Sequence, residues 1–82
     1  MISSGCVRVD INNADVEGYI RLNCNGTISD VDNLGIVLED GLSLMAHDGE
    51  IEFHGVVRLP GNEAVWRLEV DWHDIFAKHA NL

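Results

Sequence analysis

The chain has 82 residues, which suits one small domain, and its 46% hydrophobic and 23% charged content is typical of a globular protein. Fourteen Asp and Glu residues against five Lys and Arg give a formal net charge of −9, which argues against direct binding of nucleic-acid phosphates. No run of residues is long and apolar enough to cross a bilayer, and no secretion signal is recognised. We therefore expect a cytoplasmic location and no membrane partner.

Two strands are expected near the N-terminus. Residues 5–11 alternate strictly, with Val7 and Val9 on the same face. A loop rich in Asn and Asp follows, and a second alternating run covers residues 18–24. The pattern predicts strands over both runs.

Residues 29–35, which follow a turn at Asn25 and Gly26, show no alternation. Asn25 and Gly26 predict a sharp turn, and Ser29 is suited to capping a single helical turn that stops at Gly35. We expect either that one turn of helix or an ordered loop.

Three antiparallel strands are expected over 42–47, 50–59 and 64–71. Asp48-Gly49 is a strong hairpin signal, because a type I′ turn needs positive φ at both central residues. Pro60 to Glu63 predict the second turn. The two turns predict a register that pairs Leu44 with Phe53 and Val57 with Trp66, and it also places Arg67 opposite Val56 and His54 opposite Glu69. This register puts these apolar side chains on one face: Leu42, Leu44, Ala46, Ile51, Phe53, Val57, Leu59, Trp66, Leu68 and Val70.

A helix is expected over residues 72–80, where the apolar period changes from that of a strand to that of a helix. Asp71 is a good N-cap, and Asp74 near the start suits the helix dipole. Trp72 and Phe76 predict that the helix docks on the open face or end of the sheet.

These elements define a mainly β class with one short C-terminal helix, in a single domain over 1–82. The expected architecture is a five-stranded antiparallel meander, either a small SH3-like barrel or a strongly bent sheet capped by the helix. No family motif accompanies this architecture, so it transfers no function.

Catalytic and metal-binding patterns are weak, and we expect no enzyme, cofactor or metal. Asp30 to Gly35 match the first, third and sixth positions of an EF-hand loop, but Leu34 and Gly41 stand where oxygen ligands are needed. No phosphate loop or nucleophile elbow is present. The cysteines Cys6 and Cys24 are interpreted as buried thiols, and the histidines His47, His54, His73 and His79 do not cluster in the sequence.

An outward-facing surface is the best candidate for binding. It comprises Tyr19, Arg21, His54, Val56, Arg58, Val65 and Arg67. Its arginines, together with Arg8, either bind an acidic peptide or ligand, or neutralise carboxylates on neighbouring strands: Asp10, Glu52, Glu69 and Asp71.

The leading hypothesis is a non-enzymatic protein-interaction module that forms a homodimer through a sheet edge or through its weakly apolar outer face. One alternative is an acidic inhibitor that imitates nucleic acid, motivated by the neighbouring carboxylates of Asp30, Asp32, Glu39 and Asp40. Another is a small RNA-binding barrel, which requires the arginines to converge around Tyr19.

Overall fold

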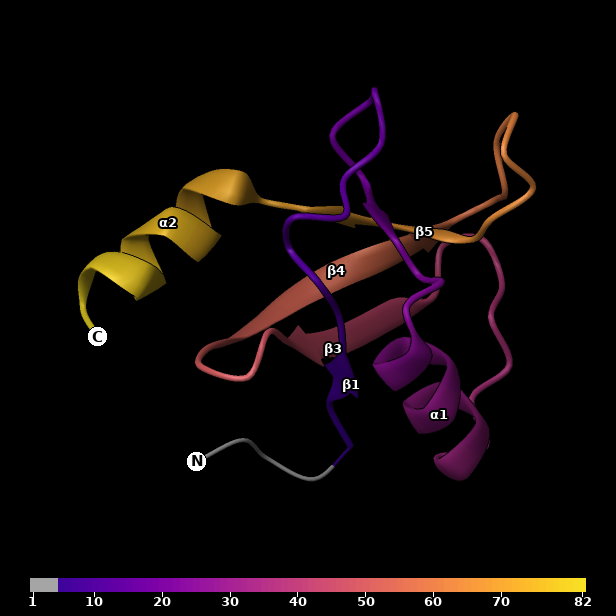
Figure 1. The fold of residues 1–82 in the computed structure, drawn as a ribbon, viewed down its shortest axis with the longest axis horizontal. Coiled ribbons are helices and arrows are strands. Elements are labelled where there is room, and N and C mark those ends of the chain that lie inside the picture. Colours follow the sequence, from indigo (N-terminus) through magenta and orange to yellow (C-terminus); the bar gives the residue numbers. More distant parts are fainter. Residues whose placement is uncertain (1–4) are drawn as a thin grey trace.

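Five strands form one curled sheet, and two helices lie beside it (Figure 1). The computed structural model describes residues 5–82; residues 1–4 of the predicted domain 1–82 lie outside the described residues. The elements are β1 (Val7–Arg8), β2 (Ile20–Arg21), α1 (Asn25–Asn33), β3 (Ser43–His47), β4 (Glu52–Arg58), β5 (Arg67–Val70) and α2 (Trp72–Ala80). The predicted mainly β, barrel-like class with a C-terminal helix is confirmed.

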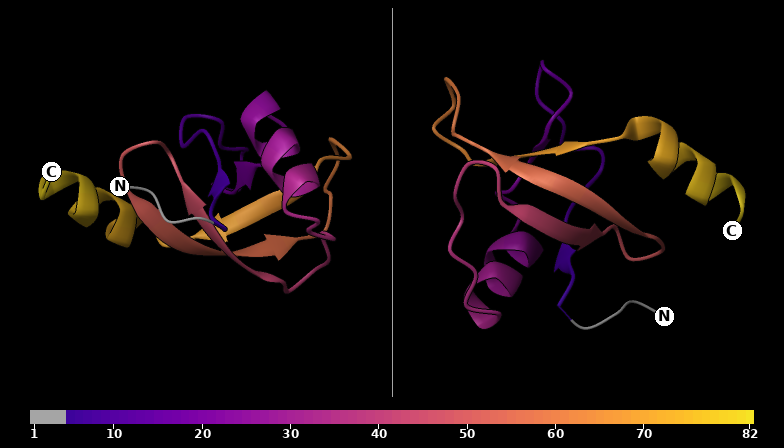
Figure 2. Two further views of the ribbon diagram at one scale, coloured as in Figure 1. Left: turned by 90° about the horizontal axis from the view of Figure 1, so that it is seen from below. Right: turned by 180° about the vertical axis from the view of Figure 1, so that it is seen from behind.

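The strand order is β1-β3-β4-β5-β2. Strands β3, β4 and β5 form the predicted antiparallel meander, but β1 pairs in parallel with β3, and β2 pairs with β5 at the opposite end. Both N-terminal strands have only two residues, so the runs 5–11 and 18–24 are mostly irregular. Alternation of apolar and polar residues indicates which side chains of a strand are buried, but it does not indicate which other strand pairs with it. In Figure 2 the N-terminal segments and α1 lie together on one side of the β3-β4-β5 sheet, which gives its apolar face the cover it needs.

Both predicted registers are wrong by two residues. Leu44 pairs with Gly55 where Phe53 was expected, and Val57 pairs with Leu68 where Trp66 was expected. Because side chains alternate with a period of two, a shift of two residues leaves every side chain on its predicted face.

Asp48 explains the first shift. Its carboxylate accepts the backbone N–H groups of Glu50 and Ile51, each at 3.0 Å, so residues 48–51 form a four-residue loop in place of a two-residue turn. The second loop, residues 59–66, is also longer than predicted. Arg67 stabilises it by donating from Nε and Nη2 to the carbonyl oxygen of Leu59.

The core lies between the meander and the N-terminal segments. Phe53 is buried and Trp66 packs against the same cluster, as predicted. Leu59, which lies in the second loop, is exposed. The buried apolar side chains are Val7, Val9, Ile20, Leu22, Leu44, Ala46, Ile51, Phe53, Val57, Leu68 and Ile75.

Helix α1 replaces the predicted turn, and it is attached to β1 through side chains. The Thr27 hydroxyl donates to the Arg8 carbonyl oxygen at 2.6 Å, and the Asp30 carboxylate accepts the Arg8 backbone N–H at 2.8 Å. Both residues lie on the same helix face, since they are three positions apart. The two bonds satisfy the backbone of β1 on the side that faces away from β3.

Helix α2 begins at the predicted residue, with the Asp71 carboxylate accepting the N–H groups of His73 and Asp74. Ile75 anchors it in the core, but Phe76, expected to dock, is 63% exposed. The helix projects from one end of the sheet and does not lie across its face (Figures 1 and 2). Within residues 5–82, neither helix has the length and apolar composition to span a membrane.

Candidate functional site

The predicted binding residues separate into two groups. Four of them gather where the second loop meets the segment before β2: Tyr19, Arg21, Val65 and Arg67. The other three lie on β4 and alternate with its buried residues, so they face away from the core and from α1: His54, Val56 and Arg58.

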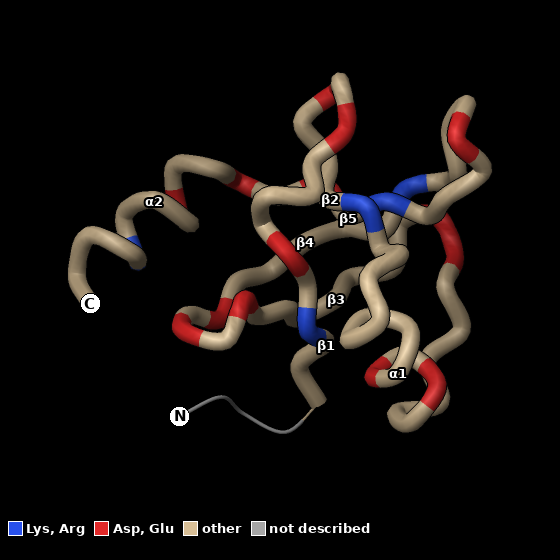
Figure 3. The backbone as a smooth tube through the Cα atoms, viewed as in Figure 1, with Lys and Arg blue, Asp and Glu red and all other residues tan. Residues whose placement is uncertain are grey.

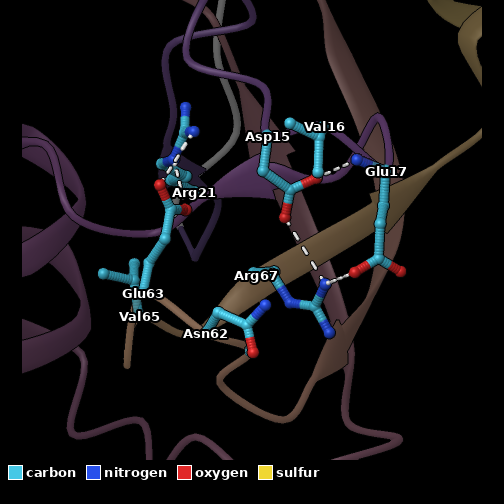
Figure 4. Close-up of a pocket in the computed structure, with 9 residues that line it drawn as sticks. Asp15, Val16, Glu17, Arg21, Asn62, Glu63, Val65 and Arg67 are labelled. Atoms are coloured by element: carbon cyan, nitrogen blue, oxygen red, sulfur yellow. Dashed lines mark hydrogen bonds and ion pairs between the residues drawn. The ribbon is translucent and has the colours of Figure 1, made fainter.

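Three residues of the first group, Arg21, Val65 and Arg67, line a charged pocket of about 160 Å³ (Figure 4). Its lining comprises Asp15, Val16, Glu17, Arg21, Gly61, Asn62, Glu63, Val65 and Arg67. Arg21 forms a bidentate ion pair with Glu63, with Nε to Oε1 at 2.8 Å and Nη2 to Oε2 at 3.1 Å. This pair lowers the pKa of Glu63 and raises that of Arg21.

Arg67 is the other cation of the charged pocket. Its Nη1 donates to Glu17 at 2.8 Å and to Asp15 at 3.4 Å, and its guanidinium lies over the Tyr19 ring, 4.8 Å from the centroid. Burial alone would raise the pKa of Asp15, but the backbone N–H groups of Tyr19 and Glu17, together with Arg67, lower it. Arg67 and its two carboxylates are thus already paired.

Arg58 on β4 is also paired. Its Nε donates to Glu69 at 2.8 Å, which raises the pKa of Arg58. His54 is hydrogen-bonded to the Ser43 hydroxyl and stands opposite Met45. The cross-strand pairs expected from the sequence, Arg67 with Val56 and His54 with Glu69, do not form, because the register differs by two residues.

The arginine surface therefore matches neutralisation better than capture of an acidic ligand. One of the four carboxylates expected as neutralising partners, Glu69, forms an ion pair with an arginine. The other carboxylates that pair with arginines are Asp15, Glu17 and Glu63. The RNA-binding alternative requires arginines around Tyr19. Arg67 is there, but the adjoining carboxylates would repel phosphate.

A second surface is an apolar groove that the sequence analysis did not predict. The α1 groove, as we call it, has a volume of about 450 Å³ and is lined by Leu22, Ile28, Val31, Asp32, Gly35, Ile36, Val37 and Leu38. Ile28 is 57% exposed and Val37 is 80% exposed, so both present most of their apolar surface to solvent. A signal for this surface existed in the spacing of Ile28, Val31 and Asp32, which share one face of α1.

The part of the chain that forms most of the α1 groove is acidic. Between Arg21 and Arg58 the sequence has no Lys or Arg, and it carries Asp30, Asp32, Glu39, Asp40, Asp48, Glu50 and Glu52. In Figure 3 the backbone of α1 and of the segment leading to β3 shows acidic residues and no basic ones. Asp32 lines the groove itself.

Both edges of the sheet are engaged within the chain. Helix α1 bonds the backbone of β1 through Thr27 and Asp30. At the other edge, the Arg21 N–H donates to the Asn13 carbonyl oxygen at 2.9 Å, and Ala14 bridges to Ile20. A partner strand would have to displace these contacts before it could extend the sheet.

The third hollow has a volume of about 490 Å³ and is polar, with Arg8, Asp48, Glu50 and His79 in its lining. His79 Nε2 lies 2.7 Å from Asp48 Oδ2, which ties α2 to the first hairpin loop. Burial alone would raise the pKa of Asp48, but the N–H groups of Ile51 and Glu50, with His79, lower it.

Metal-binding and thiol chemistry have little support in the part of the chain that the structure describes. Over residues 5–82 no group of three His, Cys, Asp or Glu side chains is arranged to hold a metal ion. Asp30 to Asn33, expected in an acidic loop, belong to α1. Cys6 and Cys24 are both free thiols, and burial, with Glu52 nearby, raises the pKa of Cys6.

Comparison with protein-family models, with curated proteins and with solved structures found no match for this chain.

Proposed function

We propose that the protein is a non-enzymatic protein-interaction module and that it binds a segment of another protein in the α1 groove. The observation that carries the proposal is the exposure of Ile28 and Val37 beside a hollow of about 450 Å³. A groove of this size accommodates a few anchoring side chains, which is how short segments are commonly bound. We also propose that the curled sheet is related to SH3-like barrels, which would suit a binding role.

The other surfaces support binding less well. The cations of the charged pocket are paired with carboxylates of the same chain, so a ligand would have to compete with those ion pairs. The sheet edges are occupied by the chain's own contacts. The α1 groove combines exposed apolar side chains with a concave shape.

Selection of short random peptides displayed on a library tests this proposal. Peptides that bind the wild-type protein should lose binding to Val37→Asp, because a carboxylate in the groove would need to be desolvated. Val16→Asp is the matched control, since Val16 is fully exposed in the loop before β2 and lies outside the α1 groove. Peptides that bind wild type and Val37→Asp equally well would contradict the proposal.

A second proposal is that the protein binds a copy of itself through the outer face of the sheet. Met45 is exposed and Val56 is half-buried, and both lie on the face of β3 and β4 that points away from the core. Sedimentation over a range of concentrations tests it: a dimer that Met45→Glu dissociates supports it, and a monomer at all concentrations removes it.

The nucleic-acid mimic is a proposal of a different class, and the acidic stretch between Arg21 and Arg58 favours it. It predicts that a basic nucleic-acid-binding enzyme is retained by the wild-type protein and released when Asp30, Asp32, Glu39 and Asp40 are neutralised. Retention that survives this neutralisation would count against the mimic.

A further inference from the structure

The α1 groove combines an apolar lining with an acidic surrounding. Ile28 and Val31 from α1 and Ile36 to Leu38 from the following segment supply the aliphatic lining. Val31, Ile36 and Leu38 also pack against the core, so the base of the groove is fixed, while Ile28 and Val37 rise from it into solvent. Such a surface favours bulky apolar side chains.

Negative potential at the groove has three sources on the same side of the molecule. Asp32 lines the groove, and Glu39 directly follows its last lining residue in the chain. The C-terminal end of α1, adjoining Gly35 in the lining, has no basic residue in its last turn to offset the partial negative charge of the helix carbonyls. A positively charged group beside the groove would therefore be stabilised by all three.

The same charges disfavour three other occupants. A second copy would bring its own net charge of −9. Anionic lipid headgroups and nucleic-acid phosphates would be repelled as well. Charge complementarity thus selects a cationic partner, and the apolar lining selects one with aliphatic or aromatic anchors.

We infer that the occupant of the α1 groove is a protein segment in which bulky apolar side chains are flanked by Lys or Arg. This inference rests on the proposed function, since it names the chemistry of the partner at the same site. It predicts that apolar contacts determine where the segment binds and that the acidic rim increases its affinity.

A pair of synthetic peptides tests the inference. One repeats Lys-Leu-Leu-Lys, and its matched peptide has Glu in place of every Lys. The Lys peptide should bind wild type and Val16→Asn, should bind Val37→Asn at least about tenfold more weakly, because this change removes apolar contact without adding charge, and should lose affinity as salt is added. The Glu peptide should not bind.

The rim is tested with Asp32→Asn and Glu39→Gln, which should weaken the Lys peptide severalfold when combined. The control combines Asp74→Asn with Glu50→Gln, because it also removes two negative charges, one from α2, at the other end of the molecule from α1 (Figure 1), and one from the loop between β3 and β4, outside the groove lining. Equal loss in the control and in the rim variant would mean general attraction to an acidic protein and would overturn the inference.

The two proposals fail in different ways. Library peptides that depend on Val37 but lack Lys and Arg would overturn the cationic partner and leave the interaction module standing. A library without any peptide that depends on Val37 would overturn both.

Discussion

A β-carbon placed on Gly55 would lie 2.5 Å from Cγ of Leu68, so the glycine in the middle of β4 is what allows Leu68 to fill the core. Leu68 is completely buried, and the neighbouring strands fix the backbone on both sides of Gly55. Real side chains do not approach so closely, and the packed core gives Leu68 no free space to move into.

Gly55→Ala should therefore destabilise the fold by about 1 to 3 kcal/mol through overpacking. Urea unfolding of the variant against wild type measures the change. Gly61→Ala is the control, because a β-carbon there would meet Arg67 Cζ at an ordinary 3.5 Å. A Gly55→Ala variant as stable as Gly61→Ala would show that Leu68 can shift without cost.

Thr27 supports the second prediction. Its single hydroxyl proton goes to the Arg8 carbonyl oxygen, so the Cys24 thiol, 2.9 Å away, is the donor to Thr27. Thr27→Val retains the shape but removes the bond between α1 and β1, and it should cost about 1 to 3 kcal/mol in the free energy of unfolding.

Ser29→Ala is the matched change on the same helix. Ser29 is exposed, and its hydroxyl makes only a long 3.4 Å contact with Asn33, so we expect an effect within about 0.5 kcal/mol. Similar unfolding midpoints for the two variants would contradict the role given to Thr27.

The dependence of α1 on β1 explains why the sequence did not predict this helix. Cys24 at its N-cap makes no side-chain capping bond, and charged residues that suit the dipole are lacking in both its first and its last turn. The helix is stabilised instead by two bonds to Arg8, which is distant in sequence. Helix α2 has its cap in Asp71, and its residues were predicted correctly.

The faces of the meander were predictable and its partners were not. Alternation placed Phe53 and Trp66 correctly because one buried face is a property of each strand. The register depended on the Asp48 side chain, and the ends of the sheet depended on long-range pairing of β1 with β3. The α1 groove was missed because it exists only once α1 has formed.

Asp15 predicts a dependence of stability on pH. Its pKa is lowered in the folded protein, so its contribution to stability is fully present above its ordinary value, about 3.9, and is lost as the pH falls through the lower, folded value. Asp48 acts in the same direction. We expect wild-type stability to decline below about pH 4.

Asp15→Asn separates the Asp15 contribution from the rest. The amide oxygen can still accept the N–H groups of Glu17 and Tyr19, but the ion pair with Arg67 is lost. The variant should be less stable than wild type at neutral pH, and the difference should shrink in acid. Urea unfolding at several pH values measures how the free energy of unfolding changes with pH in wild type and in Asp15→Asn. The same pH dependence in the two proteins would rule out a protonation effect at Asp15.

Trp72 connects α2 to the loop before β2, and this gives the last prediction. Its indole Nε1 donates to the Gly18 carbonyl oxygen at 2.8 Å, and its ring lies 5.8 Å from that of Phe76. Trp72→Phe keeps an aromatic ring but removes the donor, so α2 should lose about 1 kcal/mol of docking free energy.

Hydrogen exchange of the α2 amides measures this loss, since a less firmly docked helix opens more often without global unfolding. Trp66→Phe is the control: Trp66 packs against the core, and within residues 5–82 its indole makes no hydrogen bond. Because Trp66 contributes by packing, its replacement should lower global stability. It should leave the difference in exchange rate between the α2 amides and the sheet amides unchanged. Faster exchange confined to α2 in Trp72→Phe alone would establish that the bond to Gly18 holds the helix, whereas equal exchange in both variants would assign docking to Ile75 and the Asp48–His79 contact.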